Sequence, residues 1–133
     1  MASIHREIRL AARADDVWDA LRDVGNIHKR VCPGFVTDCR MEGADARIVT
    51  FGNGMVVKEL IVDLDHKSRR VCWSAVGGRL SHHNASLQVF PEDEGCRAVW
   101  IADLLPSEMA GPIAGMIDQG LAAMKKTMER KSA

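Results

Sequence analysis

The sequence predicts an α+β fold, in which a curved antiparallel sheet wraps around one long C-terminal helix and a short N-terminal helix closes one end. Strand-like alternation recurs in six segments between residues 35 and 104, and the turns between them are too short for the crossover helices of a parallel sheet. The last quarter of the chain carries apolar side chains at helical spacing, at Ile113, Ile117, Leu121, Met124 and Met128. Strands followed by one long amphipathic helix are typical of α+β packing.

The N-terminal region contains one strand and one short helix. Residues 5–11 alternate apolar and polar side chains, which predicts a strand. The pair Asp15 and Asp16 precedes an apolar helical pattern, so we expect a helix with an aspartate N-cap that ends at Gly25. Residues 26–34 include a Pro-Gly pair and are predicted to be an irregular connection or a single extra turn.

The remaining strands and the long helix complete one predicted domain over residues 1–133. Pro106 ends the last strand, and the helix is expected over residues 107–131, with a weak point at Gly111-Pro112. The strands are predicted at residues 35–42, 46–51, 55–64, 70–76, 83–90 and 97–104.

Composition and charge exclude several classes of protein. Eighteen basic residues balance eighteen acidic ones, and the basic patch of a nucleic-acid-binding protein is missing. No apolar run reaches the roughly 20 residues that span a bilayer, and the N-terminus is too polar for a signal peptide. The expected location is therefore cytoplasmic, and the four cysteines are expected to be free, mostly buried thiols.

Gly120 lies in the middle of the apolar helix face, where a side chain would normally fill space. A glycine inside a helix costs about 1 kcal/mol relative to alanine, so its presence asks for a reason. One interpretation is that the glycine leaves room beneath the helix for a small molecule. The other is that it permits close approach of the helix backbone to the sheet.

The segment GADARIVTFGNGMVVKELIVDLDHKSRRVCWSAV covers the central predicted strands, and Trp18, Arg47, Trp73 and Trp100 are spread over the first helix and the strands. The segment resembles the central hairpins of the polyketide cyclase/dehydrase group of the START/Bet v 1-like (SRPBCC) superfamily, and the four residues fall where that group places similar residues. The resemblance covers nearly the whole chain. It implies a helix-grip fold with a pocket between the sheet and the long helix, and functions that range from ligand carriage to cyclisation and dehydration.

Strand parity identifies which side chains would face this pocket, because alternate residues of a strand face the same side. Trp100 shares a face with small alanines, His83 lies on an inward face of its strand, and Trp73 does so on the preceding strand. The predicted ligand-binding residues are Trp73, His83, Trp100, Met116, Gly120 and Met124.

Two residues are candidates for catalysis, His83 and Glu59. On the strand that holds Glu59 two apolar sets compete for the inner face, and a β-bulge could reconcile them. His82 and His83 point to opposite faces of a strand and cannot chelate one metal ion together. No sequence motif indicates a metal or a cofactor, so neither is expected.

Three functions agree with these observations. The first is binding of an apolar or aromatic small molecule, with the methionines adapting to its shape and His83 or Glu59 as a polar anchor. The second is a cyclase or dehydratase in which one of these residues acts as a general base. The third is an interaction module, a homodimer whose cavity is filled by side chains.

Overall fold

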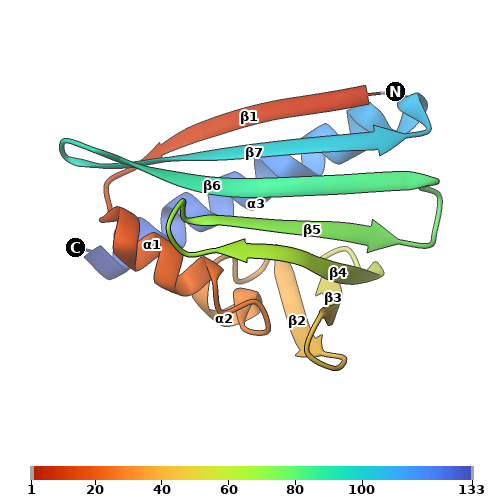
Figure 1. The fold of residues 1–133 in the computed structure, drawn as a ribbon, viewed down its shortest axis with the longest axis horizontal. Helices are drawn as coiled ribbons and strands as arrows, with labels where there is room; N and C mark the ends of the chain where they lie inside the picture. The colour runs from red at the N-terminus through yellow and green to blue at the C-terminus, as the bar shows by residue number, and fades with distance from the viewer. Residues whose placement is uncertain (1, 133) are drawn as a thin grey trace.

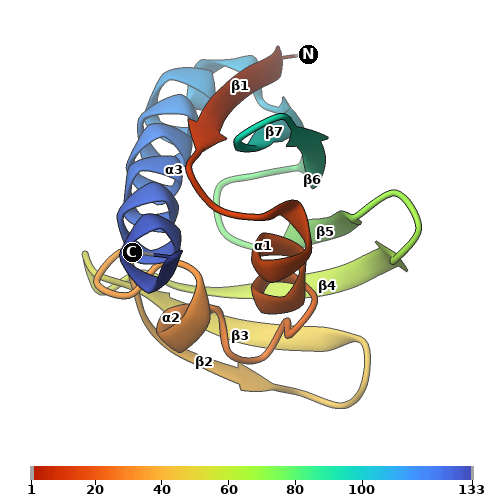
Figure 2. The same ribbon diagram turned by 90° about the vertical axis from the view of Figure 1, so that its left-hand side faces the viewer.

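The structure is a computed structural model that describes residues 2–132. Within these residues, seven strands form one antiparallel sheet in the order β1-β7-β6-β5-β4-β3-β2 (Figure 1). The strands are β1 (Ala2–Leu10), β2 (Val36–Met41), β3 (Ala46–Phe51), β4 (Val56–Asp65), β5 (Arg70–Val76), β6 (His82–Glu92) and β7 (Gly95–Leu105). The long helix α3 (Ala110–Ser132) lies along the concave side of the sheet, as Figure 2 shows. This is the predicted helix-grip α+β fold.

Two short helices, α1 (Ala14–Leu21) and α2 (Ile27–Arg30), close the end of the sheet near the C-terminal end of α3 (Figure 2). The aspartate N-cap predicted for α1 is wrong. The cap position is Arg13, which makes no side-chain capping bond. Asp15 lies in the first turn instead, where its negative charge favours the helix dipole, and its carboxylate pairs with Arg69 at 2.8 Å. The helix also ends at Leu21 rather than at Gly25, while α2 is the predicted extra turn.

The inner faces of the strands agree with strand parity. Ala98, Ala102 and Leu104 of β7 are at most 1% exposed, and Leu87 and Val71 on the neighbouring strands are also buried. The outward-facing Ile101 of β7 is 36% exposed. The core therefore lies between the concave face of the sheet and α3.

Strand β4 accommodates its two apolar sets through the predicted bulge. The pairing register with β5 shifts between Ile61 and Asp63, so that both Ile61 and Leu64 pack against the core. Glu59 lies on the inner face and is 7% exposed. The alternate set points outward, and its exposed members are Val56, Leu60 and Val62.

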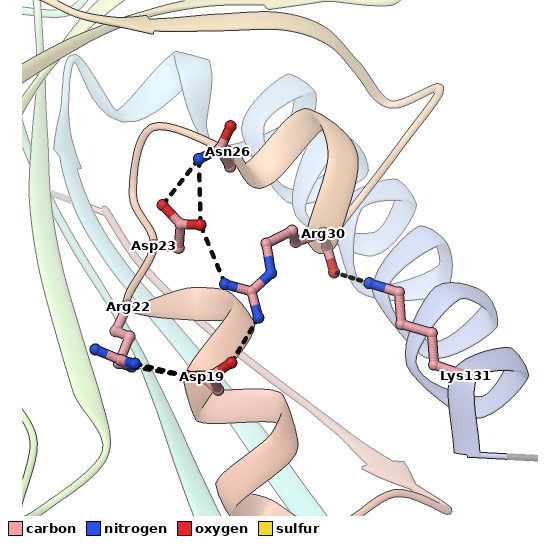
Figure 3. A network of polar contacts seen from close by, with 6 residues as sticks. All are labelled: Asp19, Arg22, Asp23, Asn26, Arg30 and Lys131. Carbon is pink, nitrogen blue, oxygen red and sulfur yellow. Dashed lines mark hydrogen bonds and ion pairs between the residues drawn. The ribbon is translucent and has the colours of Figure 1, made fainter.

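Arg30 of α2 connects three helices through a polar network (Figure 3). Its guanidinium bonds Asp19 of α1 at 2.6 Å and Asp23 at 3.1 Å, and its carbonyl accepts a bond from Lys131 of α3 at 3.4 Å. The hydrogen bond from Arg30 lowers the pKa of the Asp19 carboxyl. Such exposed pairs contribute little to stability, but through them Arg30 joins α2 to both α1 and α3.

None of the helices within residues 2–132 is both long enough and apolar enough to cross a bilayer.

Candidate functional site

A cavity of about 150 Å³ lies between the N-terminal half of α3 and the concave face of the sheet. Most of its wall is apolar, and four lining residues carry a charged, titratable or thiol group: Cys32, Arg47, Glu59 and His83. The apolar lining residues include Ile27, Phe35, Phe51, Met55, Val57, Trp73, Ala75, Leu80, Trp100, Ile113, Met116 and Ile117.

Aromatic rings form much of this wall. Trp73 of β5 and Trp100 of β7 meet edge to face, with ring centroids 5.5 Å apart. Phe35 and Phe51 pack in the same way at 5.4 Å. Edge-to-face pairs stabilise each other beyond the area that they bury, so these rings provide a fixed, flat-sided surface for a ligand.

Arg47 and Glu59 form an ion pair in the cavity wall. They are directly opposite each other on β3 and β4, and Nε of Arg47 donates to Oε1 of Glu59 at 2.9 Å. Arg47 also donates to the Val24 carbonyl at 3.0 Å and lies 5.7 Å from the centre of the Trp73 ring. The side chains are only 6% and 10% exposed. A buried charge needs a partner, and here each charge supplies the partner of the other.

His83 occupies the place where β5 and β6 stop pairing. Their register continues only to Trp73 and Ala85. Beyond that point the Ala75 N–H donates to Nδ1 of His83 at 2.9 Å, and the Ser74 hydroxyl donates to the His83 carbonyl at 2.6 Å. Because Nδ1 accepts a bond, the proton of the neutral imidazole is on Nε2. Burial lowers the pKa of His83, which favours this neutral form.

The lowered pKa of His83 predicts how the free energy of unfolding depends on pH. The unfolded chain takes up a proton at this histidine near pH 6.5, whereas folded His83 takes it up at a lower pH. The folded state should therefore lose stability as the pH falls below 6.5, with a contribution of at most about 1.4 kcal/mol per pH unit. His83→Gln, whose amide oxygen can accept the Ala75 bond, should lack this contribution. Urea unfolding at pH 8, 6 and 5 measures it, and identical slopes for the two proteins would contradict the buried, neutral histidine.

Cys32 contributes a thiol to the wall but no reactive group. Burial raises its pKa to about 12, and the thiolate is the nucleophilic form of cysteine. Its sulfur lies 3.8 Å from the carbonyl of Ile27. This thiol is therefore an apolar surface element at neutral pH.

The predicted site residues fall into two groups. Five of them, Glu59, Trp73, His83, Trp100 and Met116, line the cavity. Gly120 and Met124, which were also predicted as ligand-binding residues, are not among the residues that line this cavity.

The inner side of Gly120 is occupied by neighbouring side chains. An added Cβ there would lie 3.0 Å from the Phe35 ring and 3.1 Å from the Trp100 ring. The space beneath the glycine is therefore filled by aromatic rings. Met124 is 1% exposed and packs into the core about two turns beyond Ile117, the last residue of α3 that lines the cavity.

Sequence reasoning did not identify Arg47 as a site residue. The signal was present in the turn Gly52-Asn53-Gly54, which joins two predicted antiparallel strands. A hairpin centred on Asn53 pairs Arg47 with Glu59, as the register shows. A charged residue of each sign at directly opposite, inward positions indicates a buried pair.

Several proteins of known structure share this fold. The chain matches solved structures that include the START superfamily protein from Mycobacterium smegmatis, with a TM-score of 0.71, 10% identity, and coverage of 93% of this chain and 97% of that chain. Norcoclaurine synthase from Thalictrum flavum, solved in complex with dopamine and hydroxybenzaldehyde, matches with a TM-score of 0.69 and 18% identity over 94% of this chain and 84% of that chain. The TM-scores show a shared fold, and at these identities the similarity is one of fold alone.

A third similar structure is the di-domain ARO/CYC BexL from the BE-7585A biosynthetic pathway, with a TM-score of 0.83 and 16% identity. The match covers 97% of this chain and 47% of BexL, so this chain spans about half of that protein.

A search of curated proteins found no significant match. At the level of sequence, the profile of the polyketide cyclase/dehydrase and lipid transport family matches residues 1–129. The chain is therefore a member of the polyketide cyclase/dehydrase and lipid transport family, with the START/Bet v 1-like fold.

Proposed function

We propose that this protein binds a small, mainly apolar molecule, such as an aromatic metabolite, in the cavity between α3 and the sheet. The observation that carries the proposal is the cavity itself, a concave apolar space with a few polar groups at defined positions. Such sites are where proteins usually hold small ligands. The dopamine and hydroxybenzaldehyde held by norcoclaurine synthase, which has the same fold, support a ligand of this kind.

The geometry favours binding over acid–base catalysis. A general base needs an unprotonated atom within reach of the substrate proton. The unprotonated nitrogen of His83 already accepts the Ala75 N–H, and one oxygen of Glu59 accepts from Arg47. Nδ1 of His83 is therefore not free to take a proton, and Glu59 is held as the partner of Arg47, whereas both side chains can act as hydrogen-bonding anchors.

The homodimer with a side-chain-filled cavity is supported less well. That hypothesis requires side chains to occupy the space between α3 and the sheet, and about 150 Å³ there is open. The outward side chains of β4 expose apolar surface at Val56, Leu60 and Val62. That surface is on the other side of the sheet from the cavity, so pairing through it would be compatible with a bound ligand.

Filling the cavity tests the proposal. Ala75 lines the cavity near the end of β5, so Ala75→Leu should place three more carbon atoms in the ligand space. We expect acetophenone, an uncharged ring compound used as a probe, to raise the melting temperature of the natural sequence and not that of Ala75→Leu. Val76→Leu, on the outward face of the same strand and 39% exposed, is the matched control and should respond like the natural sequence. An equal response in all three proteins would place the ligand elsewhere and overturn the proposal.

A further inference from the structure

The size of the cavity limits the number of rings in its ligand. Engineered cavities of about 150 Å³ lined by Leu, Ile and Phe hold one benzene molecule, and this cavity has about the same volume. The tryptophan pair and the Phe35–Phe51 pair restrict it further, because packed rings move little. A fused two-ring or three-ring compound therefore exceeds this volume and would have to extend beyond it toward solvent.

The polar groups of the wall define where a ligand can be polar. His83 uses Nδ1 to accept the Ala75 N–H, so the ring offers one group to a ligand, the Nε2–H donor. A ligand that approaches His83 must supply an acceptor, such as a carbonyl oxygen. A hydrocarbon of the same shape would leave this N–H without a partner once water is displaced, and an unpaired buried donor is unfavourable.

The charges of the wall limit the charge of the ligand. Arg47 and Glu59 neutralise each other at 2.9 Å. A carboxylate in the cavity would add a second negative charge beside Glu59 with only one guanidinium to balance both. In a mainly apolar cavity, an unbalanced negative charge of this kind is strongly unfavourable. Because it is paired with Glu59, Arg47 does not make the cavity an anion site.

We propose that the cavity selects uncharged compounds with a single aromatic ring and a hydrogen-bond acceptor that receives the Nε2–H of His83. This inference rests on the proposed function, since it presumes a ligand in the cavity. Glu59 acts here as a specificity-determining residue, because its negative charge cancels that of Arg47. Catalysis is not part of the inference.

Four probes of related shape test it by isothermal titration at pH 7.5. Acetophenone carries a carbonyl, α-methylstyrene replaces the oxygen by CH₂, benzoate replaces the methyl ketone by a carboxylate, and 2-acetonaphthone adds a second ring. Acetophenone should bind about 2–10-fold more tightly than α-methylstyrene, the effect of one hydrogen bond. Benzoate and 2-acetonaphthone should bind at least about tenfold more weakly than acetophenone.

Variants then assign the selection to its residues. His83→Leu should abolish the preference for acetophenone over α-methylstyrene, and His82→Leu, on the opposite face of the same strand and exposed, should keep it. Glu59→Gln keeps the shape of the side chain but leaves Arg47 uncompensated, so benzoate should gain relative to acetophenone. Equal affinities for acetophenone, α-methylstyrene and benzoate in the natural sequence would overturn the selection and leave ligand binding intact. Binding of none of the four would overturn both.

Discussion

Glu59→Leu is expected to lower the free energy of unfolding by about 3–5 kcal/mol, the usual result of leaving one member of a buried ion pair alone. Arg47 would keep its bond to the Val24 carbonyl and its position beside the Trp73 ring, but it would hold an uncompensated charge in the wall of an apolar cavity. Since single domains are stable by about 5–15 kcal/mol, this change removes a large share of the total.

Two comparisons make the measurement specific to the buried pair. In the double variant Arg47→Met/Glu59→Leu no charge remains, so most of the lost stability should return. Glu42→Ala removes one member of the neighbouring Lys58–Glu42 pair, whose side chains are 42% and 49% exposed, and should lower the free energy of unfolding far less than Glu59→Leu. Urea unfolding measures all three. If Glu59→Leu lowers the free energy of unfolding no more than Glu42→Ala does, the Arg47–Glu59 pair is not buried as described.

Gly120→Leu is expected to destabilise the protein by about 1–3 kcal/mol, because it overpacks a filled part of the core. Its first side-chain atom already lies 3.0 Å from the Phe35 ring and 3.1 Å from the Trp100 ring, and the remaining atoms extend further toward them. The gain of about 1 kcal/mol from removing a helical glycine is smaller than this strain.

Gly115 provides the matched control on the same helix. It is exposed, and a Cβ built there has no neighbouring atom within 4 Å. Gly115→Leu should therefore show the helix-propensity gain alone and be more stable than the natural sequence. Thermal unfolding of the two variants separates the accounts. If Gly120→Leu is as stable as Gly115→Leu, the glycine does leave an empty space, as the first interpretation from the sequence proposed.

Features that depend on residues close together in the sequence could be predicted from the sequence. Alternation predicted the strands and their inner faces, since the side-chain direction of a strand is a local property. Both β3 and β5 begin and end at the predicted residues. The bulge in β4 was also predictable, because its apolar residues occupy both faces and one shift of register reconciles them.

The features that the sequence could not predict depend on contacts between distant segments of the chain. The inner side of Gly120 could not be known without the positions of Phe35 and Trp100, which come from other elements. Asp15, predicted as part of the cap, lies in the first turn of α1, and its carboxylate pairs with Arg69 in the distant β4–β5 turn. The orientation of Glu59 required its partner Arg47, and that pairing follows from hairpin register rather than from the pattern within either strand.

The central claim, that a ligand occupies the cavity, is tested most directly by NMR of protein labelled with ¹³C in its methionine methyl groups. Met55 and Met116 line the cavity, Met128 is buried elsewhere in the core, and Met41 is 38% exposed. Titration with acetophenone should shift the Met55 and Met116 signals saturably and leave those of Met128 and Met41 in place. Saturable shifts at Met128 or Met41 without any at Met116, or no saturable shift at all, would contradict the account.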